Sequence, residues 1–437
     1  MNLTYNDAIK WIQSRLQFGI KPGLHRMKKM MEKLDHPEKE LKVIHVGGTN
    51  GKGSTVTYIR SMLTEAGYHV GTFTSPAIEQ FNERISIDGE PIKDNEIVQL
   101  VQVMQPIVKE MEELEEGSPT EFEVITAMAI YYFARIQPVD LVIFEVGLGG
   151  KQDSTNILTP IVSIITNIGL DHTHILGSSL AEIASEKAGI MKRHVPVITA
   201  VKQHEANEII QEKAREMEAV IYSMNEQFQV FHDFSIARGE RFSFQSIFGE
   251  IQNLELLMLG AHQVENAGVA VMTILYLQKY HRFQISEKEL RSGLKKAYWP
   301  ARMELLQYHP PIIIDGAHNP EGMRALVKTL QKRYPSRSLK IVFSALRDKE
   351  LSHILSILES LDSELYFTEF DVPRAASASE LLEASPHRQA TVVPDWQKLL
   401  RHLSVSLKDE EVLVVTGSLY FLSAMKPFLV DLIEGQD

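Results

Sequence analysis

The fold is decided by residues 41–57, whose sequence is LKVIHVGGTNGKGSTVT. An apolar strand over 41–46 runs into a glycine-rich turn, and the turn opens a helix. Backbone N–H groups can converge in such a turn because glycine has no Cβ, and at a helix N-terminus they bind phosphate with help from the helix dipole. Lys52 adds a positive charge, and the Ser54 and Thr55 hydroxyls can reach a phosphate-bound Mg²⁺. The stretch predicts a nucleotide site; the alternative is a chance lysine in a plain strand–turn–helix loop.

The turn differs at one position from the common phosphate-binding pattern G-x-x-x-x-G-K-[ST]. Gly53 stands between Lys52 and Ser54. The strand before the turn and the helix after it still provide the structural context that the motif requires. We therefore expect nucleotide contacts from the turn and the start of the helix, namely from Gly48, Thr49, Asn50, Gly51, Lys52, Gly53 and Ser54.

Length and composition limit the possible classes of protein. A chain of 437 residues is too long for one ordinary core, and 44% hydrophobic with 23% charged residues is typical of a soluble globular protein. The net charge of −12 argues against general binding to nucleic acid or to anionic membranes. Cysteine is absent, which excludes disulfides, thiolate catalysis and cysteine-based zinc sites.

Targeting signals are also missing from the sequence. The N-terminus lacks the basic and then apolar pattern of a secretory signal, and the apolar region 124–133 is too short to span a bilayer. We expect a cytoplasmic protein with neither nucleic-acid nor membrane partners.

Strands and helices alternate along most of the chain. Apolar strands are predicted at 139–146, 161–166 and 195–200, and the first of these, VDLVIFEV, has the composition of a central strand covered on both faces. The pattern indicates an N-terminal α/β domain with a mainly parallel sheet of the P-loop NTPase type. Short alternating strands over 227–259 predict a small antiparallel extension, and 77–88 is expected to be an irregular loop.

A second α/β unit follows a basic, proline-punctuated stretch at 291–303. Its expected strands lie near 312–315, 339–344, 364–370 and 411–416, with helices between them. We predict an ATP-binding domain over 1–296 and a C-terminal Rossmann-like α/β domain over 297–437.

Polar residues gather where the predicted strands of the first domain end. Ser75, Glu145, Asp171 and His172 each follow a strand. Because ligands of parallel sheets bind beyond the carboxyl ends of the strands, these side chains can surround one nucleotide–metal site. The alternative for Glu145 is an ordinary salt bridge. Zinc is disfavoured at His172 and His174, because neighbouring histidines on a loop tend to point in different directions.

The second unit carries its own candidates. Asp315 and His318 lie in DGAHNP at a strand end, where they can face a ligand across a domain cleft. Asn319 can instead simply cap the helix that Pro320 begins. Arg302 can clamp a phosphate or remain a surface arginine.

Taken together, a series of segments resembles the folylpolyglutamate synthase and dihydrofolate synthase family of Mur-ligase-like ATP-dependent amide ligases. In chain order they are GTNGKGS (48–54), TSP and FNERI (74–85), EVGLGG with DSTN (145–156), DHTHILG (171–177), SEKAGI (185–190), HQVENA (262–267), AR (301–302) and DGAHNP (315–320). GTNGKGS alone fits other Mur ligases, whereas FNERI, SEKAGI and DGAHNP in this order are much more specific.

The resemblance implies the reaction and its partners. ATP would phosphorylate a carboxylate of a folate or of dihydropteroate, and the amine of L-glutamate would then displace the phosphate. The implied cofactors are ATP and two Mg²⁺ ions, and the implied state is a monomer. Which acceptor is used is left open.

The resemblance also implies roles for individual residues. Ser75 with Glu145 would hold one Mg²⁺, and Glu145 with His172 a second. Lys187, which periodicity alone predicts to be a solvated surface lysine, matches a lysine that the family carbamylates, and with Lys52, Glu145 and His172 it would form the catalytic set. The remaining implied contacts are those of Asn266, Arg302 and Asp315 with the nucleotide, and those of Phe81, Asp153, His318 and Ser418 with the substrates.

Two positions depart from the family pattern. Ala77-Ile78 stands where the family has His-Leu, and Lys151 where it has Arg. Both positions lie near the expected folate loops. The competing hypotheses are another Mur-type amino-acid ligase, a P-loop kinase or NTPase without ligase activity, and an inactive nucleotide-binding scaffold.

Overall fold

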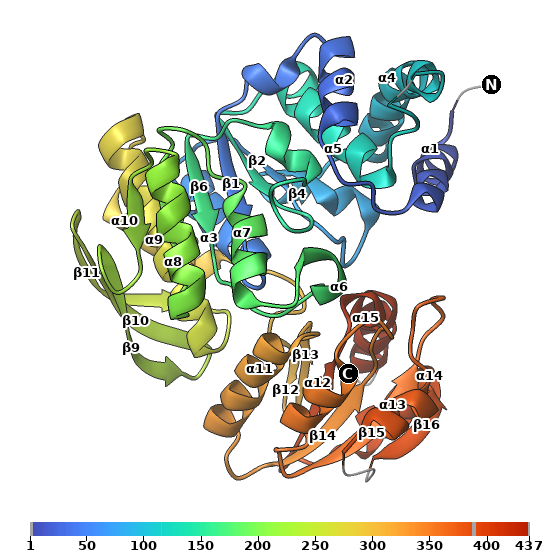
Figure 1. Ribbon diagram of the computed structural model, residues 1–437. Coiled ribbons are helices and arrows are strands. Elements are labelled where there is room, and N and C mark those ends of the chain that lie inside the picture. Colours follow the sequence, from blue (N-terminus) through green and yellow to red (C-terminus); the bar gives the residue numbers. More distant parts are fainter. Residues whose placement is uncertain (1–2, 115, 387–389, 436–437) are drawn as a thin grey trace.

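The structure is a computed structural model that describes residues 3–114, 116–386 and 390–435. Two α/β units lie one above the other, and a small antiparallel sheet lies beside the first (Figure 1). No helix in the described residues is long and apolar enough to cross a membrane.

The first unit is built on a sheet with the strand order β4-β3-β2-β5-β1-β6-β7-β8. Its strands are β1 (Val43–Gly47), β2 (Val70–Phe73), β3 (Ile85–Ile87), β4 (Glu90–Pro91), β5 (Leu141–Glu145), β6 (Val162–Ile165), β7 (Val197–Thr199) and β8 (Ile221–Ser223). All neighbouring pairs from β2 to β8 are parallel, and only the edge pairs formed by β3 and β4 are antiparallel. The predicted parallel α/β sheet is confirmed.

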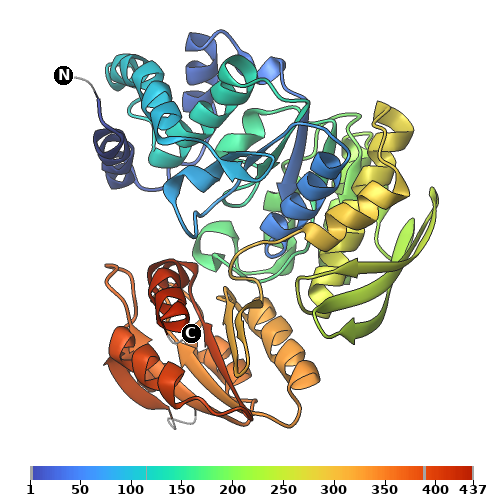
Figure 2. The same cartoon turned by 180° about the vertical axis from the view of Figure 1, so that it is seen from behind.

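Helices cover both faces of this sheet because its central strands are apolar on both sides. On β1, Ile44 and Val46 belong to one core while Val43 belongs to the other, as the alternation of strand side chains requires. The first core is completed by α3 (Lys52–Glu65), α9 (Ala261–His281) and α10 (Glu287–Lys296), which Figure 2 shows on one face. The opposite face carries α1 (Tyr5–Gln13), α2 (His25–Lys33), α4 (Asp94–Glu112), α5 (Glu121–Tyr131), α7 (Leu180–Ala188) and α8 (His204–Glu216).

The small sheet confirms the predicted antiparallel extension. It consists of β9 (Phe228–Ile236), β10 (Gly239–Ser246) and β11 (Gly249–Leu256). Phe242, Phe244 and Leu254 are buried in the same core as α3 and α9.

The C-terminal unit has the strand order β12-β13-β17-β14-β15-β16. Its strands are β12 (Glu304–Tyr308), β13 (Pro311–Asp315), β14 (Ser338–Phe343), β15 (Ser363–Glu369), β16 (Thr391–Asp395) and β17 (Glu411–Thr416). One face is covered by α11 (Pro320–Arg333), α12 (Leu351–Leu358) and α13 (Ala378–Ala384), and the other by α14 (Trp396–Ser406) and α15 (Leu419–Glu434). The four strands predicted here are present.

Three local differences from the expectations have clear causes. Residues 77–88 are not wholly irregular, because a 3-10 turn (Phe81–Arg84) leads into β3, which pairs with β2. The strands β8, β12 and β16 were not predicted from the sequence; β12 and β16 are edge strands without an all-apolar run. Finally, residues 291–296 lie within α10 rather than in a connection. The boundary at 296/297 stays a prediction.

Candidate active site

The nucleotide turn connects β1 to α3, and its glycines are required by its backbone. Gly48 and Gly51 have φ of 143° and 80°, in the left-handed region that favours glycine. A Cβ at Gly48 would come within 1.9 Å of Thr166 Oγ1, and a Cβ at Gly51 within 2.3 Å of Asn266 Oδ1. Asn266 on α9 therefore lies directly against the turn.

Gly53, the departure from the common motif, is explained by tertiary packing. A Cβ at this position would lie 2.7 Å from the indole Nε1 of Trp299. Trp299 belongs to the segment between α10 and β12 that joins the two units. The glycine thus makes room for the connection to pack on the first turn of α3.

Lys52 is folded back over the turn, where its Nζ donates to the carbonyls of Gly48 at 3.1 Å and Thr49 at 3.2 Å. The next loop along the sheet edge holds the turn from the other side, because Asn50 N donates to Asn167 Oδ1 at 2.8 Å. The carbonyl groups that now hold Lys52 are weak partners for an ammonium. A phosphate oxygen would be a better one.

Glu145, at the end of β5, is 5% exposed, and its Oε2 accepts from the backbone N–H of Ser75 at 3.3 Å. Burial raises the pKa of Glu145, while the charges of Lys52 and Arg302 oppose that rise. A carboxylate oxygen is a ligand that suits Mg²⁺, and the backbone contact brings Ser75 next to it in the fold. Within the described residues Glu145 forms no ion pair within 4.0 Å, so the structure gives the salt-bridge alternative no partner.

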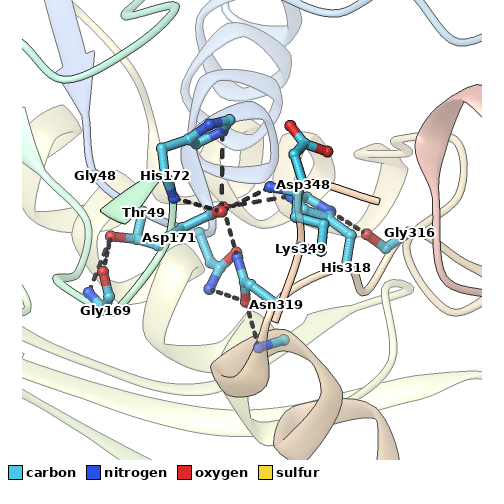
Figure 3. Close-up of polar contacts among 12 residues, drawn as sticks. Gly48, Thr49, Gly169, Asp171, His172, Gly316, His318, Asn319, Asp348 and Lys349 are labelled. Atoms are coloured by element: carbon cyan, nitrogen blue, oxygen red, sulfur yellow. Dashed lines mark hydrogen bonds and ion pairs between the residues drawn. The ribbon is translucent and has the colours of Figure 1, made fainter. Parts of the chain in front are cut away.

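Asp171 joins the two units (Figure 3). Its Oδ1 accepts from Lys349 Nζ at 2.6 Å, and its Oδ2 accepts from Asn319 Nδ2 at 3.1 Å and lies 3.6 Å from His318 Nε2. Burial alone would raise the pKa of Asp171, but hydrogen bonding to His318 and the charges of His318 and Lys349 hold it well below its ordinary value.

His172 follows Asp171 in a left-handed backbone conformation, with φ of 50°. Burial lowers the pKa of its imidazole to about 4, so the ring is neutral at physiological pH and has a nitrogen lone pair that can coordinate a metal ion. The rings of His172 and His174 are 6.3 Å apart and tilted by 50°. Within the described residues, no group of three or more His, Asp or Glu side chains is placed to hold a metal ion.

The nucleotide turn and the DGAHNP segment meet directly. Asn50 Nδ2 donates to Asn319 Oδ1 at 3.1 Å, and Asn319 Nδ2 donates to Asn50 Oδ1 at 2.9 Å. Asn319 also caps α11 by accepting from Gly322 N at 2.9 Å. Capping and interdomain contact are therefore combined in one side chain.

Lys187 on α7 is 5% exposed, and its Nζ donates to the carbonyl of Gly48 at 2.9 Å. The surface position that periodicity alone predicts is wrong. Burial, assisted by the charge of Lys52, lowers the pKa of Lys187 to about 7. Such an amine is substantially uncharged near neutrality and is nucleophilic.

Arg302 and Asp315 lie close together beneath the cleft. Burial lowers the pKa of Arg302, and burial raises that of Asp315, each opposed by the charge of the other. Asp315 also accepts from the backbone N–H groups of Met303 at 2.8 Å and Ala317 at 2.9 Å. Arg302 is partly exposed, and its guanidinium donates to the carbonyl of Ala301 at 3.2 Å.

The other predicted substrate residues are more dispersed. Asp153 is buried, and its carboxylate accepts from Leu148 N at 2.8 Å and Thr155 N at 2.9 Å, so it shapes its own loop. Phe81 packs beside the core formed by α4 and α5, with the Arg84 guanidinium 5.7 Å from its ring centre. Ser418 is buried at the start of α15.

Lys349 and Asn319 were not among the predicted site residues. Lys349 lies in the loop after β14, at the same edge of the C-terminal sheet as DGAHNP. Ligands of parallel sheets bind beyond the carboxyl ends of the strands, and applying this rule to the second unit as well as to the first would have found Lys349. Together with Asp171 and His318 it lines a cavity of about 20 Å³, room for about one water molecule.

Known proteins share this organisation. The family description "Mur ligase middle domain" matches residues 46–274, and "Mur ligase, glutamate ligase domain" matches residues 301–419. The dihydrofolate synthase/folylpolyglutamate synthase of Bacillus subtilis is 45% identical over 426 residues, covering 98% of this chain and 99% of its own. The folylpolyglutamate synthase of Lacticaseibacillus casei is 34% identical over 440 residues, covering 98% and 99%.

A solved structure agrees with these relatives. Mycobacterium tuberculosis folylpolyglutamate synthase complexed with ADP and AMPPCP superposes with a TM-score of 0.88 at 28% identity, covering 97% of this chain and 99% of that one. The resemblance seen in the motifs is confirmed: this chain belongs to the folylpolyglutamate synthase/dihydrofolate synthase family of Mur ligases.

Proposed function

We propose that this protein is an ATP-dependent ligase that joins L-glutamate to a carboxylate of a folate, of dihydropteroate, or of both. The observation that carries the proposal is the direct contact of the nucleotide turn with DGAHNP through Asn50 and Asn319. A phosphate bound at the turn would lie beside polar groups of the second unit. The names of the relatives, which are folylpolyglutamate and dihydrofolate synthases, support the same substrates.

The chemistry starts from a poor electrophile, since a carboxylate resists attack by an amine. In the first step a carboxylate oxygen attacks the γ-phosphorus of ATP, and the bond to ADP breaks. In the second step the amine of L-glutamate attacks the acyl carbon, the C–O bond to phosphate breaks, and the amine loses a proton. The products are an amide, ADP and inorganic phosphate.

The turn and Lys52 would bind the phosphates. Backbone N–H groups at the start of α3, and the Lys52 ammonium once it leaves the carbonyls of Gly48 and Thr49, would stabilise the charge that develops during phosphoryl transfer. Arg302, whose planar guanidinium suits phosphate oxygens, would contact the nucleotide with Asn266 and Asp315. Asn266 and Asp315 are buried, where water screens polar interactions less.

Ser75, Glu145 and His172 would hold Mg²⁺, with Glu145 shared between two ions. Bound Mg²⁺ would supply the positive charge that lets two anions approach and that stabilises the transferring phosphoryl group. The buried Glu145 carboxylate and the neutral His172 ring support this assignment.

Lys187 would be carbamylated by carbon dioxide. The neutral amine attacks CO₂, a C–N bond forms, and a proton is released, which turns a cation into an anionic oxygen donor. The lowered pKa of about 7 and the buried position support this role. The resulting carboxylate-like group suits a site crowded with cations.

His318, Lys349 and Ser418 would receive L-glutamate. Lys349 is now paired with Asp171, and His318 lies against the same carboxylate, so an incoming carboxylate must displace that residue. The cavity of about 20 Å³ between these groups is far smaller than an amino acid. We infer that the units 1–296 and 297–437 move relative to one another during the cycle.

Phe81 and Asp153 would take part on the folate side. The Phe81 ring beside the Arg84 guanidinium offers an apolar surface for a flat ring system. Asp153 would act by fixing the loop 147–153, in which Lys151 stands where the family has Arg.

The test is release of phosphate with ATP, Mg²⁺, a folate and L-glutamate, omitting one component at a time. We expect release to require both the folate and L-glutamate, with amide product detected by mass spectrometry. ATPase activity indifferent to both additions would rule out the ligase and favour a nucleotide switch. Comparing turnover of dihydropteroate and tetrahydrofolate under identical conditions then decides which acceptor is used.

A further inference from the structure

Residues 75–84 form a loop of the first unit that is held by the second. Ile78 is 3% exposed, and its side chain is buried among residues that cover the C-terminal sheet, including Leu419 and Phe421. The departure from His-Leu at 77–78 therefore keeps an apolar anchor at position 78. Figure 1 shows α15, which carries Leu419 and Phe421, on the side of the C-terminal unit that faces the first.

An ion pair lies next to this anchor. Glu79 Oε1 is 2.5 Å from Nζ of Lys426, a residue of α15 that is 9% exposed. The same Nζ lies 2.8 Å from Glu304 Oε1 on β12 and 3.2 Å from the hydroxyl of Tyr298 in the connection between the units. One ammonium thus joins the loop, the connection and the C-terminal sheet.

The loop is tied internally, so a contact at its centre is felt at both ends. The Glu83 carboxylate accepts from the backbone N–H groups of Ile78, Glu79 and Gln80. At one end of the loop, the backbone N–H of Ser75 donates a hydrogen bond to Glu145 Oε2. Phe81 lies two residues after Glu79. These are the residues assigned above to metal and folate.

We propose that Lys426 is a positioning residue for folate: together with Ile78 it fixes the loop 75–84 against the C-terminal unit and so sets the KM for the folate substrate. The assignment of folate to this loop rests on the proposed function, whereas the docking of the loop does not. Because the contact reaches Phe81 within the loop itself but reaches the nucleotide turn only through Tyr298 and Trp299, removing it should raise the KM for folate more than the KM for ATP.

Two substitutions remove the contact from opposite sides. Lys426→Met keeps most of the buried stem, and Glu79→Gln removes the charge of its half-exposed partner while keeping the side-chain shape. The matched control is Lys340→Met. Lys340 has the same 11% side-chain exposure and a similar carboxylate pair, with Glu364 at 2.8 Å and Glu411 at 3.4 Å, but all three residues lie within the C-terminal unit.

We expect Lys426→Met and Glu79→Gln each to raise the KM for folate about tenfold, as loss of a charge-assisted hydrogen bond predicts. The KM for ATP should stay within about twofold of its value in the unchanged protein, because the hydrogen bond that is lost is not one made by the nucleotide turn. The double variant, Lys426→Met with Glu79→Gln, should have the same KM for folate as Lys426→Met alone. Lys340→Met should leave the KM for folate unchanged. The proposal is overturned if the two substitutions raise the KM for folate additively, or if Lys340→Met raises it as much as Lys426→Met does.

Amide hydrogen exchange tests the docking without activity. Peptides covering 76–84 should exchange faster in both variants than in the unchanged protein, and no faster in Lys340→Met. Unchanged exchange in this segment overturns the positioning role, whatever the enzyme does. The two proposals can fail separately. If the variants exchange faster but the unchanged protein shows no folate-dependent phosphate release, the inference that Lys426 docks the loop stands and the proposed function is refuted.

Discussion

At the scale of single residues, the candidate site contains two lysines, Lys52 and Lys187, that contact backbone carbonyl groups. Lys52 rests on carbonyls of its own turn, and Lys187 is buried against Gly48 of the same turn. Neither has a carboxylate as its hydrogen-bond partner there. Both are therefore available to a ligand, and each gives a separate prediction.

Replacing Lys52 with Ala should lower folate-dependent phosphate release by at least about 100-fold, because one preorganised charge at a developing anion has an effect of this size. Thermal unfolding should be nearly unchanged, since Lys52 makes only two hydrogen bonds to its own turn. The exposed Lys288→Ala on α10 serves as the control and should behave as the unchanged protein. Near-normal turnover in Lys52→Ala would show that the nucleotide site lies elsewhere.

Lys187→Ala should lower turnover, and bicarbonate should partly restore it because a small anion can replace a lost carbamate. With ¹³C-labelled bicarbonate, the unchanged protein should give a carbamate NMR signal that strengthens as pH rises through 7, where the amine loses its proton. Lys192→Ala is the matched control, because burial also lowers the pKa of Lys192, and this variant should keep the signal. A signal that survives Lys187→Ala would contradict the assignment.

At the scale of elements, the connection between α10 and β12 is packed into the start of α3. Trp299 lies against Gly53, and the neighbouring Tyr298 contacts Lys426 on α15. The connection therefore touches both the nucleotide helix and the C-terminal unit. Its packing explains why the motif carries a glycine where the common pattern has a hydroxyl residue.

Gly53→Ala should destabilise the protein by about 1–3 kcal/mol, as overpacking of a tight contact does. The indole atoms nearest the added methyl group are Nε1, Cε2 and Cζ2, which phenylalanine lacks in that position. Adding Trp299→Phe should therefore recover part of the loss, measured by urea unfolding. If the second substitution only adds to the first, the contact with Trp299 is not the reason for the glycine.

At the scale of the whole molecule, Asp171 links the units at the cleft. Its carboxylate has a pKa held below the ordinary value in the folded protein, so its contribution to stability is complete above the unfolded pKa and declines as pH falls. The decline should begin below about pH 4, the unfolded value of an aspartate. Below that pH the unfolded chain takes up a proton at Asp171 while the folded carboxylate stays charged, and this favours unfolding.

Asp171→Asn should cost about 1–3 kcal/mol of unfolding free energy near neutral pH, since it leaves the Lys349 ammonium without its carboxylate. The difference between variant and unchanged protein should shrink in acid, because protonation of Asp171 has the same effect. Urea unfolding at pH 7 and pH 3 measures both. A difference that does not depend on pH would assign the stability to something other than this charge.

Much of the fold could be predicted, because its main signals are local. The apolar strands 139–146 and 161–166 were located from composition, and the glycines of the turn from the backbone freedom they supply. Edge strands such as β16 were missed because they lack an apolar run and depend on a neighbouring strand. The candidate site residues at strand ends could be grouped from the sequence because parallel strands bring their carboxyl ends to one edge of the sheet.

The sequence by itself determined the strand–turn–helix that is predicted to bind phosphate, the succession of apolar strands along the chain, and the family. These follow from backbone geometry and from motifs that each lie within a few residues. Only the tertiary structure decided that Lys187 is buried, that Asn50 meets Asn319 across 269 residues, and that Lys349 meets Asp171 across 178. Periodicity reports only neighbours along one element, whereas desolvation and charge pairing at the cleft depend on how two separately built sheets pack together.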